Sequence, residues 1–277
     1  MYVKPSEVIE ECLQAAKKKA SLPIIEMLVK GALSGAFLGF ATSLVMVILA
    51  QGLPPFVGAV AFPVGFVMLV LMGFELATGN FALMPQALAA GHVGKGQMLR
   101  NWVWVYLGNL LGSLFYAGLF YIAITNSGTN DGGAIAEQTR LAAQKKTLAY
   151  SAVGALGWNT AFVKGMLCNW MVTMGTVMAF VSRSTGGKVI AMWIPITIFF
   201  AHGYEHCVVN MFLIPSGMLL GAPISLTDWL FWNQLPVTIG NIISGAIFTG
   251  LALFFVLRAK KSEAEQLESL SQEITTV

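Results

Sequence analysis

The sequence predicts an all-α integral membrane protein with six transmembrane spans, arranged as inverted three-helix repeats that contain two broken helices. Hydrophobic residues make up 56% of the 277 positions and charged residues only 10%, whereas a soluble domain carries about 25% charged residues. A helix needs about 20 apolar residues to cross the hydrocarbon core. Uncharged runs of this length cover residues 31–50, 53–74, 101–125 and 229–257. The composition therefore excludes an ordinary soluble domain.

Six spans account for the apolar stretches of the chain. Short clusters of Gly, Pro and Ser separate most of them. The 258–277 segment is expected to be a cytoplasmic tail, residues 1–26 an amphipathic N-terminal helix, and residues 127–148 a polar loop. The predicted transport domain covers 27–257, with a first repeat at about 27–126 and a second at about 151–257. The expected spans are 27–52, 55–88, 100–126, 151–181, 187–217 and 229–257.

The distribution of Lys and Arg predicts the orientation of these spans. With six spans, both termini lie on one side of the membrane, and that side holds eleven of the sixteen basic residues. Cytoplasmic loops carry an excess of Lys and Arg, so both termini are expected to be cytoplasmic. The expected location is a bacterial inner membrane, or an organelle inner membrane if a targeting peptide has been removed.

Charge and cysteine usage bear on partners and cofactors. The net charge of +3 is small and does not indicate nucleic-acid binding. Cys12, Cys168 and Cys207 are scattered along the chain and have no metal-ligand spacing. We therefore expect no nucleic-acid partner, no cofactor and no metal; the partners expected are the lipid bilayer and a small solute.

The two halves of the chain match in three places, in the same order. The offsets between matching positions are 134, 130 and 132 residues, which indicates a duplication. Each repeat holds three spans, and an odd number forces the second copy to insert upside down, as in many transporters and channels. The matches are 28–33 with 162–167, 73–85 with 203–215, and 101–118 with 233–250.

Candidate breaks lie in the second and fifth spans. Ala77-Thr78-Gly79 is expected to interrupt the second, and His202-Gly203-Tyr204 the fifth. Broken backbone at membrane depth is tolerated only where it is buried in protein or lines a cavity. A substrate site is therefore expected near the midplane, where these breaks meet.

Four ionisable residues within spans occupy equivalent positions in the two repeats. Inversion places Lys30 and Lys164 toward opposite faces, where each would raise the local anion concentration. The alternative is that both lysines extend to lipid headgroups. Glu75 and Glu205 would repel an anion if their carboxylates were free. We therefore expect both glutamates to be hydrogen-bonded structural groups that hold the broken segments.

His206 stands where the repeat places Leu76, so the two copies differ here by a protonatable group. A midplane imidazole can give a hydrogen bond or a proton to a dehydrated anion; the alternative is a core histidine. Asn169 and Asn210 are expected nearby.

The run from His202 to His206 matches H-x-x-E-H, a zinc-binding pattern that needs a regular helix. Gly203 argues against a regular helix here, so no zinc site is expected.

Three motifs of the chain are informative together: Gly73-Phe74-Glu75-Leu76-Ala77-Thr78-Gly79-Asn80, Lys164-Gly165-Met166-Leu167-Cys168-Asn169-Trp170 and Gly203-Tyr204-Glu205-His206-Cys207-Val208-Val209-Asn210-Met211. At this spacing they resemble the formate/nitrite transporter family, over about residues 25–257. The resemblance implies an aquaporin-like fold of six spans per protomer, a pathway in each protomer, and a homopentamer. The run from Lys164 to Trp170 resembles the nitrite branch more than the formate branch.

The resemblance also implies roles for individual residues. His206 looks like the central histidine of the family, with Asn169 and Asn210 near it and Thr78 facing it. Ala77 departs from the bulky residue that many members carry, and would widen the inner constriction. Phe62 and Phe199 resemble the outer constriction, and Phe66, Leu76 and Val172 the inner one.

The function that these features predict is a channel or transporter for small monovalent anions, nitrite or formate first and bicarbonate as a further candidate. A channel for a small neutral solute is the alternative, although paired Asn-Pro-Ala boxes are absent from the sequence. A membrane-embedded enzyme using His206 and Glu205 is a third interpretation. No nucleophile, metal set or cofactor motif supports it, so no enzymatic activity is expected.

Overall fold

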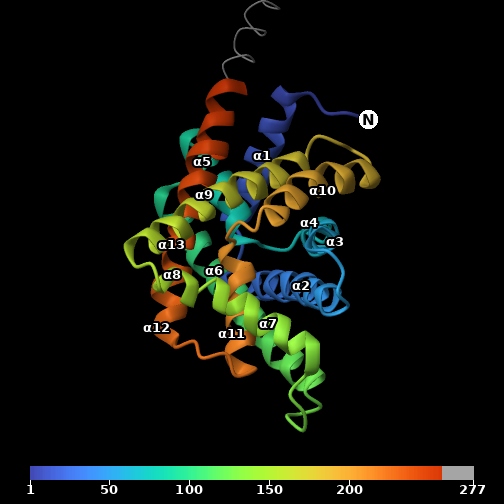
Figure 1. Cartoon of the computed structure of the whole chain (residues 1–277). Helices are drawn as coiled ribbons and strands as arrows, with labels where there is room; N and C mark the ends of the chain where they lie inside the picture. Colours follow the sequence, from blue (N-terminus) through green and yellow to red (C-terminus); the bar gives the residue numbers. More distant parts are fainter. Residues whose placement is uncertain (258–277) are drawn as a thin grey trace, which may run out of the picture.

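The computed structural model describes residues 1–257, so the predicted tail at 258–277 lies outside the described residues. Every regular element in the described part is a helix, and the only strand-like pairing there is an isolated bridge between Tyr2 and Ser182. Figure 1 shows helices crossing and packing around one another, with α1 toward one end of the molecule and α7 and α12 toward the opposite end. The prediction of an all-α fold is confirmed.

The first half of the chain contains α1 to α6 and the second half α7 to η2. Two segments near the C-terminal end, η1 and η2, have π-helical hydrogen bonding. The first-half helices are α1 (Pro5–Ala20), α2 (Ile24–Ala50), α3 (Pro55–Ala61), α4 (Pro63–Leu71), α5 (Ala77–Ala89) and α6 (Lys95–Ile124). The second-half helices are α7 (Gly133–Lys145), α8 (Leu148–Ser151), α9 (Ala155–Met178), α10 (Thr185–Ala201), α11 (Cys207–Leu219), α12 (Leu226–Trp229), η1 (Leu230–Gln234), α13 (Leu235–Ile243) and η2 (Ser244–Leu251).

Three helical segments of the described chain are long and apolar enough to cross a membrane. They cover Ile24–Ala50, Lys95–Ile124 and Leu226–Leu257. Three shorter apolar helices, Pro55–Leu71, Thr185–Ala201 and Cys207–Leu219, come from the stretches that were expected to contain breaks. Each of these stretches is one apolar run that contains a break. Hydropathy does not detect the break, so by hydropathy alone the run looks like one long span.

Each break is a two-residue turn that ends in a glycine, followed by three residues outside any helix. Gly73 has φ of +68° and Gly203 has φ of +65°, a left-handed conformation that a residue with a Cβ adopts only with strain. The first break lies at 72–76 and α5 begins at Ala77. The expectation that Ala77-Thr78-Gly79 interrupts the helix was therefore wrong: these residues form the first turn of α5.

The expectation of a polar loop at 127–148 was also wrong, because most of this segment is helical. It contains α7 and the start of α8. Its sequence is too polar for a membrane span, but Ala136, Thr139 and Ala143 recur on one side and are buried. Ala143 packs in one apolar cluster with Ile214 of α11. The segment is therefore an amphipathic helix that covers one end of the bundle.

The N-terminal helix α1 covers the other end of the bundle. Its buried face includes Ile9 and Leu13, which share an apolar cluster with Leu83 and Met84 of α5. The residues before it are also fixed: the Val3 N–H donates to the Val181 carbonyl at 2.9 Å. The helix is thus tied to the bundle along its length.

Helices α2 and α6 approach each other at small residues. A Cβ added to Gly31 would lie 3.0 Å from the Cα of Gly108, and one added to Gly112 would overlap the carbonyl group of Ala32. Small residues allow this close backbone approach between helices in a membrane.

Gly112→Ala is expected to destabilise the protein by about 1–3 kcal/mol, because the new methyl group must push two backbones apart. Gly118→Ala in the same helix is the matched control, because no atom lies within 4 Å of a Cβ there. The measurement is thermal unfolding of the two purified variants. Equal melting temperatures would mean that the close approach of α2 and α6 is not needed.

Candidate functional site

The two breaks meet at a hydrogen bond between Thr78 and His206. Thr78 lies in the first turn of α5, and His206 is the residue immediately before α11. The Thr78 Oγ1 and His206 Nε2 atoms are 3.1 Å apart. Both side chains are buried, with exposed fractions of 0% and 2%. The structure therefore brings together the two residues that the sequence placed at the centre.

The other ring nitrogen of His206 fixes its tautomer. The Val209 N–H donates to His206 Nδ1 at 3.2 Å, so the imidazole caps the N-terminus of α11. A nitrogen that accepts this bond carries no proton, and in a neutral imidazole the proton then lies on Nε2. Nε2–H consequently donates to Thr78 Oγ1, and it is this N–H that faces α5.

Asn169 and Asn210 have different positions. Asn169 Nδ2 donates to the Thr78 carbonyl at 3.2 Å and to the Asn241 carbonyl at 2.7 Å, so Asn169 supports the central pair. Asn210 Nδ2 instead donates to a carboxylate oxygen of Glu205 at 2.9 Å. The structure thus places Asn169 beside the centre and Asn210 in a neighbouring carboxylate cluster.

One phenylalanine stacks on the histidine, and a second packs against the first. The ring centroids of Phe62 and Phe199 are 5.7 Å apart in an edge-to-face arrangement. Phe199 in turn stacks on His206 with a centroid separation of 5.8 Å. Both phenylalanines are at most 2% exposed. Phe199 thus contacts the imidazole directly, and Phe62 packs against the edge or face of Phe199.

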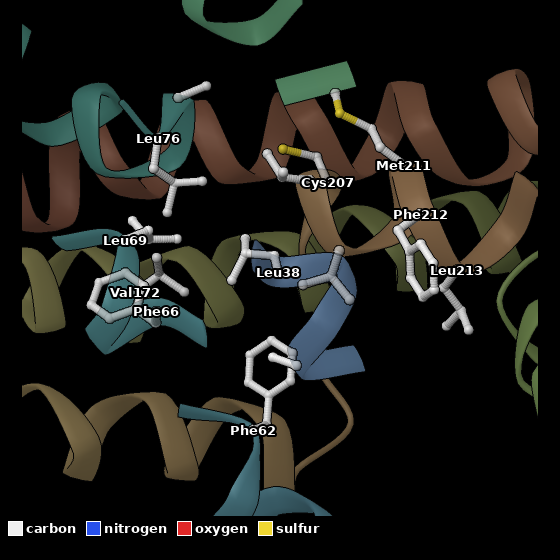
Figure 2. Packing of buried hydrophobic residues seen from close by; sticks show 14 of the residues in the cluster. Leu38, Phe62, Phe66, Leu69, Leu76, Val172, Cys207, Met211, Phe212 and Leu213 are labelled. Carbon is white, nitrogen blue, oxygen red and sulfur yellow. The ribbon is translucent and has the colours of Figure 1, made fainter. Parts of the chain in front are cut away.

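A second apolar group lies on the α5 side. Figure 2 shows Phe66, Leu69, Leu76 and Val172 among the buried apolar side chains. Phe66 and Leu76 line a cavity, whereas Val172 is fully buried and lines none of the cavities described below. Ala77 is also fully buried, and its N–H donates to Asn109 Oδ1 at 2.9 Å.

Two cavities lie near the central pair, one on the α1 side and one on the α7 side. The cavity under α1, here the α1 cavity, has a volume of about 280 Å³ and is lined by Leu76 and Gly79, the neighbour of Thr78. The cavity under α7, here the α7 cavity, has a volume of about 340 Å³ and is lined by Phe199 and His206. The Thr78–His206 hydrogen bond lies between them.

The two predicted vestibule lysines lie in different surroundings. Lys30 lines the α1 cavity and pairs with Glu26 at 2.5 Å. Lys164 lies outside the α7 cavity, in an adjoining side cavity of about 370 Å³, with its ammonium 5.6 Å from the ring centroid of Tyr150. The two lysines that the predicted repeat makes equivalent therefore line cavities with different lining residues.

Each buried glutamate pairs with a lysine, which lies in α1 for Glu75 and directly after α7 for Glu205. Lys19 Nζ lies 2.8 Å from a carboxylate oxygen of Glu75, and Lys146 Nζ lies 2.8 Å from one of Glu205. Asn80 Nδ2 also donates to Glu75 at 2.8 Å. The surrounding polar side chains are Asn80 and Asn101 near Glu75, and Tyr150, Asn210 and Asn233 near Glu205.

Two further asparagines bracket the breaks in the same way in both halves. Asn109 Nδ2 donates to the carbonyls of Gly31 and Glu75, both at 2.9 Å. Asn241 Nδ2 donates to the carbonyls of Gly165 and Glu205. Extended backbone in a helical bundle leaves carbonyl groups without helical partners, and these amides satisfy them.

The sequence reasoning missed the lysines that pair with the glutamates. A signal was present: Ala15-Ala16-Lys17-Lys18-Lys19 matches Ala142-Ala143-Gln144-Lys145-Lys146 with an offset of 127 residues. This match lies before the three matches that predict the repeat, outside the bounds expected for either copy. The match extends the predicted repeat to α1 and the end of α7.

The fold and this centre are typical of membrane channels and transporters: apolar helices are broken at a buried polar pair that separates two cavities. The chain belongs to the formate/nitrite transporter family, because the sequence model described as "Formate/nitrite transporter" matches residues 6–255. It is an integral membrane protein, and the family consists of transporters and channels, not enzymes.

Named relatives agree with this assignment. The chain is 33% identical to "Formate channel BtFdhC" of Bacillus thuringiensis, covering 91% of this chain and 95% of the relative. A solved structure named "FNT family ion channel" matches 90% of this chain and 98% of its own, with a TM-score of 0.77 and 28% identity. A second solved structure, "Pentameric formate channel with formate bound", matches 84% of this chain and 97% of its own, with a TM-score of 0.68 and 26% identity.

Proposed function

We propose that the protein is a channel or transporter for small monovalent anions, with nitrite and formate as the first candidates and bicarbonate as a further one. The observation that carries this proposal is the position of the Thr78–His206 pair between two cavities. Apolar side chains on each side exclude hydrated ions, and the imidazole N–H offers one polar contact at the centre. The formate channels among the relatives support this substrate class.

Two short helices add to the stabilisation of an anion at the centre. α5 and α11 both begin beside the Thr78–His206 pair. The N-terminus of a helix carries a partial positive charge, and paired half-helices point such ends at anionic substrates in other transporters.

The proposed topology has six spans in two inverted three-helix repeats, in an aquaporin-like arrangement. The broken second span contains α3, α4 and α5, and the broken fifth contains α10 and α11. Both termini are assigned to the cytoplasm, so the α1 cavity opens inward and the α7 cavity outward. A homopentamer with one pathway per protomer is proposed, supported by the pentameric formate channel among the similar structures.

The test is anion flux into proteoliposomes that contain the purified protein. Formate, nitrite and bicarbonate are compared with glycerol and with protein-free liposomes, using the change in internal pH or vesicle volume. We expect flux of at least one of the three anions above the protein-free rate, without a matching rise for glycerol. Flux of glycerol with no anion flux would favour the neutral-solute channel.

A further inference from the structure

The outer surface of the protein contains a groove between α6 and the C-terminal apolar segment, here the α6–α13 groove. Its volume is about 640 Å³, and it is lined by twelve residues from α6, from η1 and α13, and from α5. Both walls belong to segments that are long and apolar enough to cross a membrane. The lining residues Val103, Leu107, Leu230 and Leu235 are exposed, so the groove is open to the surroundings of the helices.

The polar side chains of the α6–α13 groove already have partners within the protein. The hydroxyl oxygens of Tyr106 and Thr238 are 2.8 Å apart, and Gln234 Nε2 donates to the Tyr106 hydroxyl at 2.6 Å. The indole N–H of Trp102 donates to the Asn80 carbonyl at 3.1 Å. None of the twelve lining residues is charged. A polar or ionic ligand would therefore find no free partner here, whereas a hydrocarbon needs none.

The two halves of the chain face each other across this groove. Several pairs of lining residues are related by the 132-residue offset of the predicted repeat, and one such pair is joined by the hydrogen bond between Tyr106 and Thr238. Equivalent residues come into contact only close to the axis that relates the two copies. In the proposed inverted topology this axis lies in the membrane plane, so the groove lies at the level of the bilayer midplane. The pairs include Trp102 with Gln234, Val103 with Leu235, and Tyr106 with Thr238.

The floor of the α6–α13 groove reaches the first turns of both broken helices. Phe81 lines the groove and stands one turn after Thr78 in α5. Gln234 Nε2 donates to the carbonyl of Cys207 at 3.4 Å, and Cys207 is the first residue of α11, next to His206. Gln234 belongs to η1, and π-helical turns occur frequently at functional sites. A molecule in the groove therefore packs behind the central pair.

We propose that one acyl chain of a membrane phospholipid binds in the α6–α13 groove, with its methyl end at the level of the midplane. The groove is uncharged and continuous with the apolar outer surface of two membrane-length segments, which fits a hydrocarbon chain. An apolar cavity of about 150 Å³ holds a benzene molecule, so a groove of about 640 Å³ accommodates a run of methylene groups. The methyl ends of acyl chains meet at the midplane, which is the depth of this groove. The inference rests on the proposed topology and is independent of the solute that is carried.

The first test is photo-crosslinking in phosphatidylcholine proteoliposomes. Two phosphatidylcholine probes carry a diazirine on one acyl chain, either near the methyl end or near the carboxyl end. Mass spectrometry of the digested protein locates the attached lipid. We expect the methyl-end probe to label the residues that line the groove severalfold more than the carboxyl-end probe does. Equal labelling by the two probes would place the groove away from the midplane and would overturn the proposal.

Leu107→Trp is expected to fill the α6–α13 groove, because Leu107 lines it and is exposed. In this variant, labelling of the facing residues 230–242 by the methyl-end probe should fall severalfold. Leu111→Trp is the matched control: it is the same change one turn later in α6, at an exposed residue outside the groove, and it should keep the labelling of the parent. Unchanged labelling in both variants would mean that acyl chains touch this surface without a binding site, and would overturn the proposal.

A second copy of the chain is the other apolar partner for this surface. In that case neither probe would label the groove, although both would label other apolar surfaces of the protein. That pattern would also overturn the proposal. The comparison of the two probes uses the unaltered protein, so it decides the proposal even if Leu107→Trp does not fold.

Discussion

His206→Asn is expected to abolish the rise in anion transport that falling external pH produces, while the protein still folds and assembles. The imidazole lines the α7 cavity, and its Nε2 lies 3.1 Å from Thr78 Oγ1, whose neighbour Gly79 lines the α1 cavity. An unpaired charge in a dehydrated centre costs several kcal/mol, so an anion crosses more easily if it gains a proton or a strong hydrogen bond there. Asparagine keeps a hydrogen-bond donor but exchanges no proton.

The measurement is flux against external pH in proteoliposomes for the parent and the variant. A residual pH-independent leak of the bare anion is compatible with the account, because the amide still offers a hydrogen bond. His92→Asn is the control, since His92 is exposed and lines neither cavity. The same pH profile and rate in His206→Asn as in the parent would identify His206 as a core histidine without a role in transport.

Lys146→Met is expected to be the most destabilising of the single changes considered. It leaves the Glu205 carboxylate, which is 1% exposed, without the ammonium 2.8 Å away. Breaking one side of a buried ion pair costs about 3–5 kcal/mol. For a chain of this size that is about 6–20 °C in melting temperature.

A double-mutant cycle tests the cause of this loss. Glu205→Gln removes the charge but keeps an oxygen for Asn210 and Asn233, so Lys146→Met combined with Glu205→Gln should recover a large part of the stability. Glu205→Gln alone should cost less than Lys146→Met alone, because Lys146 is 20% exposed and its ammonium can reach water. Additive losses in the double variant would show that the two side chains do not stabilise each other.

The internal repeat was the most informative sequence signal for the architecture. Matches between distant segments do not depend on hydropathy, so they indicated which two spans correspond and paired Glu75 with Glu205. The first break was placed too late because Thr78 and Gly79 are weak helix formers, yet both lie in the first turn of α5. Gly73, with its positive φ, marks the true break.

Other features could not be predicted from local sequence. The ion pairs of the buried glutamates connect residues 56 and 59 positions apart, and their lysines come from helices that carry no membrane signal. Helix α7 was missed because alanines and a threonine form its buried face, so its hydrophobic periodicity is faint. The π-helical turns η1 and η2 interrupt a run that reads as an ordinary apolar helix.

The positions assigned to the constrictions depended on the family resemblance, not on periodicity. Phe62, Phe66 and Phe199 are buried apolar residues among many others, and nothing in their spacing separates a barrier from ordinary packing. Stacking of Phe199 on His206 gives one of them a specific relation to the centre. Ala77 and Val172 have no comparable contact with His206 among the described residues, and their role stays a prediction.

The central claim is that the anion passes directly beside the His206 imidazole. Solid-state NMR on membranes that contain the protein with ¹⁵N-labelled histidine and ¹³C-labelled formate measures this approach. The chain has three histidines, so replacing His92 and His202 by asparagine leaves His206 as the only labelled ring. The account predicts dipolar dephasing between the formate carbon and Nε2. Saturable formate binding without any dephasing at His206 would contradict it.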